Sequence, residues 1–281
     1  MIRQQARAFW ASIRIGWAIE SNWTSVPLYL LYAAVRPLAL CVLVYFVYKV
    51  VNPHPGGDPY FMGIYLGNTF FTVFITLTGG LSWAIITDRE QYQIVRYVYI
   101  TPAPFMMTIL GRAVTFLGIA FSNVFLILLV GRFALGLPLG VGNVNWLLLV
   151  LAQVLGLVAA AGIGLFFAGL LLVTARHSLL LAEGIGGVFL LLCGVLYPTT
   201  KLPLALQPVA WLNPLTLWIE ASRRAFGVVS FDTRLATLPT WLLLILLTLL
   251  TGAFAWLGVR AFLGFEHLAK RHGKIDQTTN Y

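Results

Sequence analysis

The sequence predicts an all-α integral membrane protein. Sixty per cent of its 281 residues are hydrophobic and ten per cent are charged, whereas soluble domains are about half apolar and a quarter charged. Apolar runs long enough to cross a hydrocarbon core of about 30 Å, which takes roughly 20 helical residues, recur along the chain. The runs are continuous, unlike the alternating segments of about ten residues in membrane barrels, so helices are expected.

Six transmembrane helices fit these runs. We place them at residues 28–51, 60–86, 105–135, 146–174, 178–197 and 238–263. Residues 25–265 then form a six-helix transmembrane domain, and residues 266–281 form a tail.

The charge distribution predicts how these helices cross the membrane. The net charge of +9 comes from Lys and Arg that lie beside the spans, and a nucleic-acid partner is not predicted, because such partners need a clustered basic patch. Most of these cations fall on one side of a six-span arrangement. By the positive-inside rule that side is the cytoplasm. We therefore expect a protein of the cytoplasmic (inner) membrane with both termini on the cytoplasmic side.

Residues 1–24 have the pattern of an interfacial amphipathic helix. One helical face carries Ile2, Phe9, Trp10, Ile13 and Trp17, and an adjacent stripe carries Arg3, Arg7 and Arg14. Such a helix lies flat on the cytoplasmic surface, with its apolar side among acyl chains and its arginines toward acidic lipid headgroups. The alternative is a solvated helix docked on a protein partner.

Polar residues inside the predicted spans need partners or a watery path. Asn68, Thr72 and Thr76 follow one another four residues apart in the second span. They either line a permeation path or form hydrogen bonds to a neighbouring helix. Glu183 in the fifth span is expected to pair with Arg112 near the cytoplasmic end of the third, because a carboxylate at that depth needs a partner.

Residues 198–237 are too apolar for an ordinary outer loop. Four prolines, Pro198, Pro203, Pro208 and Pro214, break the segment before any helix could cross the membrane. We predict two short re-entrant half-helices that cover an outer exit. The second runs from Pro214 to about Phe226, with Asn213 as its N-cap, and Glu220 and Arg224 are spaced for an i, i+4 ion pair.

Residues 87–101, TDREQYQIVRYVYIT, predict a short cytoplasmic helix after the second span. Thr87 or Asp88 would cap it, with Glu90 in its first turn. Its remainder is too apolar to be left in water: Ile94, Val95, Tyr97, Val98, Tyr99 and Ile100. Either a cytoplasmic protein docks on this helix or the helix rests on lipid headgroups.

The sequence offers no catalytic chemistry. It contains no G-x-x-x-x-G-K-[ST] phosphate-binding loop, no pair of histidines at metal-ligand spacing within a span and no G-x-S-x-G motif. Cys41 and Cys193 lie in apolar runs and are expected to be buried thiols. We therefore predict no enzyme, no catalytic residue, no metal site and no cofactor on this chain.

In its motifs the chain resembles the membrane subunits of type 2 ATP-binding-cassette (ABC) exporters. Their second span ends in a charged cluster, followed by a short helix and a T-P before the third span. The matching residues are Asp88, Arg89 and Glu90, then Thr101 and Pro102, then Leu110, Gly111 and Arg112. Their outer signature matches Tyr197, Pro198, Leu202, Pro203, Asn213, Pro214, Leu215, Thr216, Arg224 and Gly227. Many relatives continue with G-T-x-E, whereas this chain has Gln91, Tyr92, Gln93 and Ile94.

The resemblance implies a permease that pairs with a second copy or a paralogue and with two ABC ATPase subunits, which bind ATP and Mg. Residues 87–101 would be the coupling helix, and Arg176 and His177 a second contact. The implied ATPase-coupling residues are Asp88, Arg89, Glu90, Tyr92, Val95, Arg96, Tyr99, Arg176 and His177. The candidates for the pathway or its gate are Asn68, Thr72, Thr76, Pro198, Asn213, Pro214, Glu220 and Arg224.

The aromatic-rich spans with few charges favour export of a hydrophobic or amphipathic substrate, such as a drug, a lipid or a lipid-linked molecule. Polysaccharide and teichoic-acid export permeases share the outer N-P signature and are the alternative within the family. A proton-coupled secondary transporter would have internal repeats and several acids inside the membrane, and a scaffold protein would not need a re-entrant segment.

Overall fold

The computed structural model describes residues 2–21, 25–52, 58–100, 104–140, 142, 144–174, 178–228, 230 and 232–273. Every regular element in these ranges is a helix. Five of the helices are long and apolar enough to cross a membrane. The predicted class, an all-α integral membrane protein, is confirmed.

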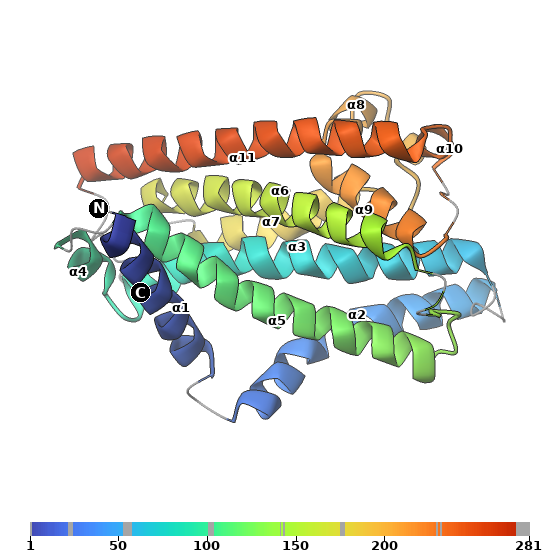
Figure 1. The fold of residues 1–281 in the computed structure, drawn as a ribbon, viewed down its shortest axis with the longest axis horizontal. Helices are drawn as coiled ribbons and strands as arrows, with labels where there is room; N and C mark the ends of the chain where they lie inside the picture. Colours follow the sequence, from blue (N-terminus) through green and yellow to red (C-terminus); the bar gives the residue numbers. More distant parts are fainter. Residues whose placement is uncertain are drawn as a thin grey trace.

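The long helices run along the longest axis of the molecule (Figure 1). They are α2 (Val26–Val51), α3 (Pro59–Glu90), α5 (Phe105–Phe133), α6 (Trp146–Val173) and α11 (Thr240–Arg271). The shorter elements are α1 (Ile2–Ser21), α4 (Val95–Ile100), α7 (Ser178–Leu192), a 3-10 turn (Thr199–Lys201), α8 (Gln207–Trp211), α9 (Pro214–Ala225) and α10 (Thr233–Ala236). In Figure 1, α4 lies at one end of the bundle, near the last turns of α11, and α8 to α10 lie toward the opposite end. We call these the α4 end and the α9 end.

The fifth predicted span differs from the helix observed there. We expected it at residues 178–197, but α7 has 15 residues, which at about 1.5 Å each reach only about 22 Å. The chain turns at Gly194, whose φ of +63° suits glycine, and the Tyr197 hydroxyl donates back to the Leu191 carbonyl at 2.6 Å. Among the described residues, therefore, five helices rather than six have spanning length.

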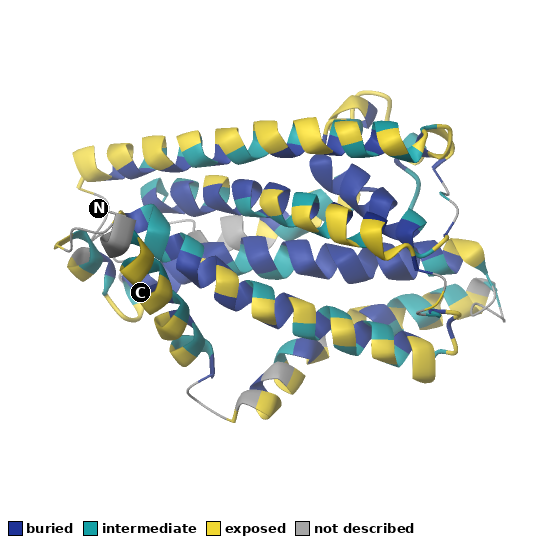
Figure 2. Ribbon diagram, in the orientation of Figure 1, coloured by how far each residue is buried: buried dark blue, intermediate teal, exposed yellow. Residues whose placement is uncertain are grey.

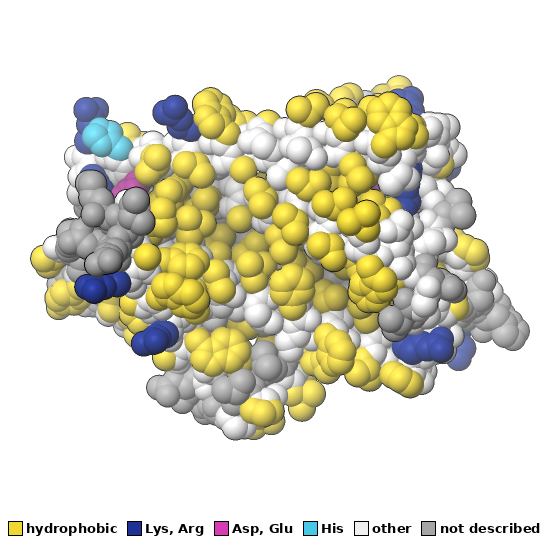
Figure 3. Space-filling view, in the orientation of Figure 1, with side chains coloured by type: hydrophobic (Ala, Val, Ile, Leu, Met, Phe, Trp, Pro, Cys, Tyr) yellow, Lys and Arg dark blue, Asp and Glu magenta, His cyan; other side chains and the backbone are white. Residues whose placement is uncertain are grey.

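α3 is the central helix of the bundle. It packs against α2, α5, α6, α7 and α9, and Figure 2 shows it buried along most of its length. The outward sides of α2, α5 and α11 carry exposed hydrophobic side chains instead. In Figure 3 such side chains cover the middle of the visible face, and most Lys and Arg side chains lie toward its ends. An apolar middle band with charged ends is typical of a protein whose central part contacts lipid.

Two close helix contacts depend on glycine. α11 packs along α6 with Gly258 against Gly162, where a Cβ on Gly258 would lie 2.1 Å from the Gly162 carbonyl oxygen. α1 packs across α5, where a Cβ on Gly111 would lie 2.6 Å from the Ser12 Cβ. Small residues of this kind let two membrane helices approach at backbone distance.

The predicted helix at residues 1–24 therefore docks on its own chain. Arg7, Trp10 and Arg14 remain on its exposed side. Contact of that side with the lipid surface stays a prediction.

Candidate functional site

The predicted helix at residues 87–101 is divided in the structure. α3 continues to Glu90, Gln91 to Ile94 form a turn, and α4 begins at Val95. Thr87 is not a cap, because its hydroxyl donates to the Trp83 carbonyl of its own helix at 3.1 Å. The predicted cap at Thr87 or Asp88 is therefore wrong. The helix continues because the next two side chains find partners inside the bundle.

The first of these is Asp88, which is 3% exposed and pairs with Arg112 of α5, which is 1% exposed. The Asp88 Oδ1 lies 2.8 Å from the Arg112 Nη1. Glu20 of α1 approaches the same guanidinium from another side, with its Oε1 3.8 Å from the Nη2. We expected Glu183 as the acidic partner of Arg112, and the Glu183 side chain lies outside the described residues. The described partners of Arg112 come from α3 and α1.

The second is Arg89, which is also buried. Its Nη1 donates to the Leu171 carbonyl of α6 at 2.9 Å, and its Nη2 pairs with Glu90 at 3.2 Å. Asp88 and Arg89 therefore face the interior, and of the three charged residues only Glu90 reaches the surface. Because the two buried charges hold α3 to α5 and α6, they fix the base of the turn.

Beyond this base, the turn and α4 present apolar side chains to the surroundings. Tyr92, Tyr97 and Ile100 are exposed, Ile100 by 80%, and we call these three residues the α4 patch. Val95 points inward and is buried. The Arg96 side chain, and Arg176 and His177 entirely, lie outside the described residues.

Tyr99 joins α4 to the last turns of α11. Its ring packs on Phe105 with centroids 5.0 Å apart, and the Lys270 Nζ lies 4.7 Å from its ring centroid. Lys270 also pairs with Glu266 at 2.7 Å. Burial, and then the Glu266 carboxylate, raise the pKa of the Tyr99 phenol. An aromatic ring that faces an ammonium group in this way attracts it electrostatically.

The polar stripe in α3 makes contacts typical of helix packing. The Asn68 Nδ2 donates to the Cys41 Sγ of α2 at 3.1 Å, and the Thr72 hydroxyl donates to the Asn68 carbonyl at 3.0 Å. Asn68 and Thr72 are buried, and Thr76 is half-buried. The Asn68 bond reaches a neighbouring helix, as the packing alternative expects, whereas the Thr72 bond stays within α3. A role of these residues in a permeation path stays a prediction.

At the α9 end, α9 begins where the second half-helix was predicted, and its re-entry into the membrane stays a prediction. The Asn213 side chain accepts a hydrogen bond from the Leu215 amide at 3.1 Å, with Pro214 at the first position of α9. Glu220 and Arg224 form the expected ion pair at 3.0 Å. Arg224 also donates to the Leu238 carbonyl just before α11, at 2.7 Å. α8 stands where we expected the first half-helix, reduced to five residues, and Pro198 lies at the N-terminal end of the 3-10 turn before it.

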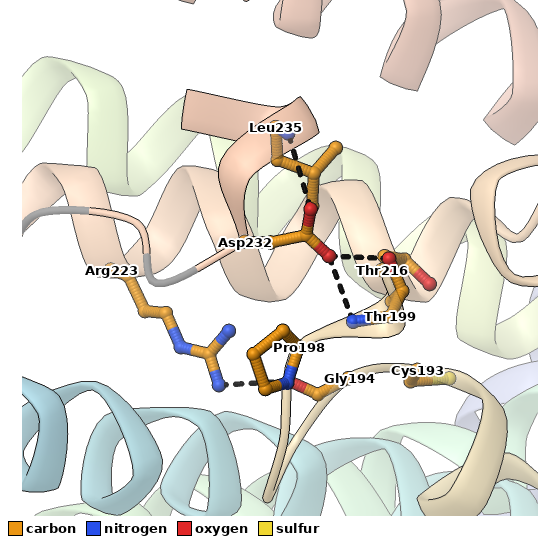
Figure 4. Close-up of a pocket in the computed structure, with 8 residues that line it drawn as sticks. All are labelled: Cys193, Gly194, Pro198, Thr199, Thr216, Arg223, Asp232 and Leu235. Carbon is orange, nitrogen blue, oxygen red and sulfur yellow. Dashed lines mark hydrogen bonds between the residues drawn. The ribbon is translucent and has the colours of Figure 1, made fainter. Parts of the chain in front are cut away.

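Our sequence reasoning missed Arg223, which joins α9 to α3 and to the loop after α7. It is buried, and its guanidinium donates to the carbonyls of Gly63 at 2.8 Å, Gly194 at 3.1 Å and Val195 at 2.9 Å. Figure 4 shows Arg223 on one side of a small niche and Asp232 on the other. The spacing from Glu220 points to Arg224, whereas no sequence pattern points to Arg223, because the partners named here are backbone carbonyls, which carry no sequence signal.

Asp232 fixes the other side of this niche. Its carboxylate accepts from the Thr199 amide at 2.8 Å and from the Leu235 amide at 3.4 Å (Figure 4). The niche leaves no space for a molecule of the size of water. It is therefore a packed junction between α9 and the loop after α7, and not a ligand site.

In the part of the chain that the structure describes, no group of three or more His, Cys, Asp and Glu side chains could hold a metal ion. Cys41 and Cys193 are buried free thiols.

Comparison with known proteins gives one family. A family model described as ABC-2 type transporter matches residues 8–227, from α1 to the end of α9. No curated protein matches the chain.

Proposed function

This chain belongs to the ABC-2 type transporter family and is an ABC transporter permease, and we propose that it exports a hydrophobic or amphipathic substrate with energy from separate ATPase subunits. The α4 end faces the cytoplasm, where both termini lie, and the α9 end faces the other side of the cytoplasmic membrane. A second permease, either an identical copy or a paralogue, completes the pathway.

The α4 patch is the observation that carries this proposal. Three exposed side chains, Tyr92, Tyr97 and Ile100, stand beside a base fixed by the buried Asp88–Arg112 pair and by the hydrogen bond from Arg89 to the Leu171 carbonyl. An exposed apolar patch on a firm base is typical of a protein-binding surface. We assign the ATPase contact to this patch together with Glu90, and assign to Asp88, Arg89, Val95 and Tyr99 the task of holding it in place.

Transport then follows from differential binding. ATP drives the two ATPase subunits together, and the permease pair changes access only to the extent that one arrangement binds the closed ATPases better. The motion enters at the α4 patch and passes into α3 and α5, because Asp88 and Arg112 join these helices. At the α9 end, the segment with Pro198, Asn213, Pro214, Glu220 and Arg224 forms the outer gate.

The composition of the spanning helices supports the proposed substrate class. The described parts of the five spanning helices are rich in apolar and aromatic side chains, which favour drug-like, lipid or lipid-linked cargo over a small polar solute.

Co-purification tests the proposal. The double variant Tyr97→Ala, Ile100→Ala removes most of the α4 patch without touching the buried pairs. It should insert normally but retain less than about a tenth of the ATPase that co-purifies with the wild-type chain, since interface anchors of this size each contribute about 1–2 kcal/mol or more. Leu204→Ala is the matched control, because Leu204 is an exposed apolar residue, 82% accessible, at the α9 end. Equal ATPase recovery in both variants would exclude the α4 patch as the contact.

A further inference from the structure

Three helices place charged groups around the Arg112 guanidinium. Arg112 comes from α5, Asp88 from the last turn of α3 and Glu20 from the last turn of α1. The Asp88 contact is a hydrogen-bonded ion pair at 2.8 Å, whereas Glu20 stands 3.8 Å away, beyond hydrogen-bond distance. We call the Arg112–Asp88 contact with α3 the tight arm of this junction and the longer Arg112–Glu20 contact with α1 the looser arm.

The tight arm controls the geometry of the turn before α4. While the Asp88 side chain is held by Arg112, its backbone carbonyl accepts from the Ile94 amide at 2.9 Å. The neighbouring Thr87 carbonyl accepts from the amides of Gln91 and Tyr92, each at 3.0 Å. A shift of Asp88 therefore displaces both ends of the turn that presents the α4 patch.

The looser arm connects the turn to α1. Gly16 seats α1 directly on the Arg112 side chain, where a Cβ would lie 2.9 Å from the Arg112 Cδ. Glu20 lies one turn further along and also accepts from the Tyr29 hydroxyl of α2 at 3.2 Å. Because the guanidinium is buried, its attraction to Glu20 is weakly screened, so the position of α1 acts on the orientation of Arg112.

We propose that Glu20 is a positioning residue for the turn at residues 91–94, acting through Arg112 and Asp88. This inference rests on the proposed role of the α4 patch as the ATPase contact. Asp88 and Arg112 hold the base of the turn, and Glu20 sets the orientation of the guanidinium that both carboxylates share. α1 therefore tunes how firmly the α4 patch is presented.

Hydrogen–deuterium exchange of the purified permease in detergent tests the positioning without any partner. Glu20→Gln keeps the shape of the side chain and removes its charge. We expect amide exchange in residues 91–100 to rise about threefold to tenfold, while exchange in residues 207–225 at the α9 end stays at the wild-type level. Arg14→Gln is the matched control, because it removes an exposed charge from the same helix and should leave both regions unchanged.

Two outcomes would overturn the inference. Wild-type exchange at 91–100 in Glu20→Gln would mean that Glu20 does not act on the turn. A rise of similar size in both regions would mean that Glu20 only supports the whole fold.

A second measurement separates this inference from the proposed function. The ATPase that co-purifies with the wild-type chain should also co-purify with Glu20→Gln. Its substrate-stimulated activity in the Glu20→Gln complex should be lower than in the wild-type complex by at least about half, whereas the Arg14→Gln complex should keep wild-type stimulation. If no ATPase co-purifies with the wild-type chain, the proposed function fails while the exchange experiment still decides the role of Glu20. If the variant complex keeps full stimulation, the positioning does not reach the ATPase, and the claim that α1 tunes the presentation of the α4 patch is wrong.

Discussion

Buried arginines hold this helical bundle together at single points. Arg112 binds a carboxylate of α3, Arg89 binds a carbonyl of α6, and Arg223 binds three carbonyls at the α9 end. A guanidinium carries five donors in a fixed plane, so one side chain can satisfy several backbone acceptors that water cannot reach. The cost of burying the charge is recovered only while those partners stay in place.

Arg223→Gln should therefore destabilise the protein strongly. The shorter glutamine side chain, with two amide donors, cannot replace all three bonds that the guanidinium donates to the carbonyls of Gly63, Gly194 and Val195, so the loss should cost about 3 kcal/mol. Thermal unfolding of the purified protein in detergent measures this loss as a fall in Tm. Arg234→Gln is the control, since Arg234 is exposed and stacks on Trp211 at 4.2 Å, and its loss should cost no more than about 1 kcal/mol. Equal Tm values for the two variants would contradict the role given to Arg223.

The cap of α9 gives a smaller effect of a different origin. Asn213→Ala removes the acceptor of the Leu215 amide and should cost about 1 kcal/mol. Asn213→Ser keeps a cap acceptor and should restore most of that stability. The Tm of the two variants in detergent measures the difference, and an alanine variant as stable as the serine variant would show that the cap contributes nothing.

At the scale of elements, two helices are joined along a glycine contact. α6 and α11 meet at Gly162 and Gly258 without room for a Cβ. Helix association in lipid depends on close packing, because burying apolar side chains there gains little over contact with lipid tails. The position of α11 is therefore set by these small residues.

Gly258→Ala should separate α11 from α6. The added methyl group would meet the Gly162 carbonyl oxygen at 2.1 Å, so the backbones must move apart, at a cost of about 1–3 kcal/mol. Gly252→Ala on the same helix meets no atom within 4 Å and should be neutral or slightly stabilising, by up to about 1 kcal/mol. Tm values measured in detergent distinguish the pair. Equal Tm values for Gly258→Ala and Gly252→Ala would refute a tight contact between the two helices.

Local signals were read correctly where the side chains involved have local partners, and structure that depends on distant partners was not predicted. Asn213 followed by Pro214 predicted the start of α9, and the spacing of Glu220 and Arg224 predicted their ion pair. At Thr87 and Asp88 the same kind of local signal misled us. The side chain of Asp88 finds its partner 24 residues away, so α3 continues where a cap was expected. Arg223 was missed for the same reason, because its partners are carbonyls on other segments.

At the scale of the whole molecule, hydropathy predicted the class and most of the long helices. It overestimated α7, because an apolar run does not show where a chain turns, and the turn at Gly194 depends on a single positive φ. It also could not show that α1 packs across α5, since that contact rests on Gly16 and Gly111 far apart in the sequence.

The proposed orientation in the membrane predicts opposite labelling of the two ends. Ile100→Cys at the α4 end and Leu204→Cys at the α9 end place a thiol at well-exposed positions, whereas the native Cys41 and Cys193 are buried and should react little. An impermeant maleimide added to intact cells should label Leu204→Cys, and Ile100→Cys should react only after the membrane is opened. Labelling of Ile100→Cys in intact cells would reverse the proposed orientation.

α11 contacts α4, where we propose the ATPase contact, at one end and α9, which we propose as part of the outer gate, at the other. Near its last turn Lys270 lies on Tyr99 of α4, and at its start Arg224 of α9 holds the Leu238 carbonyl and the Thr240 hydroxyl. Its 32 residues span about 48 Å at about 1.5 Å each, and a continuous hydrogen-bonded helix hardly shortens under load. α11 therefore acts as a rigid element of fixed length between α4 and α9. A displacement of α4 along the bundle axis must therefore either move α9 at the other side of the membrane or break one of these two contacts.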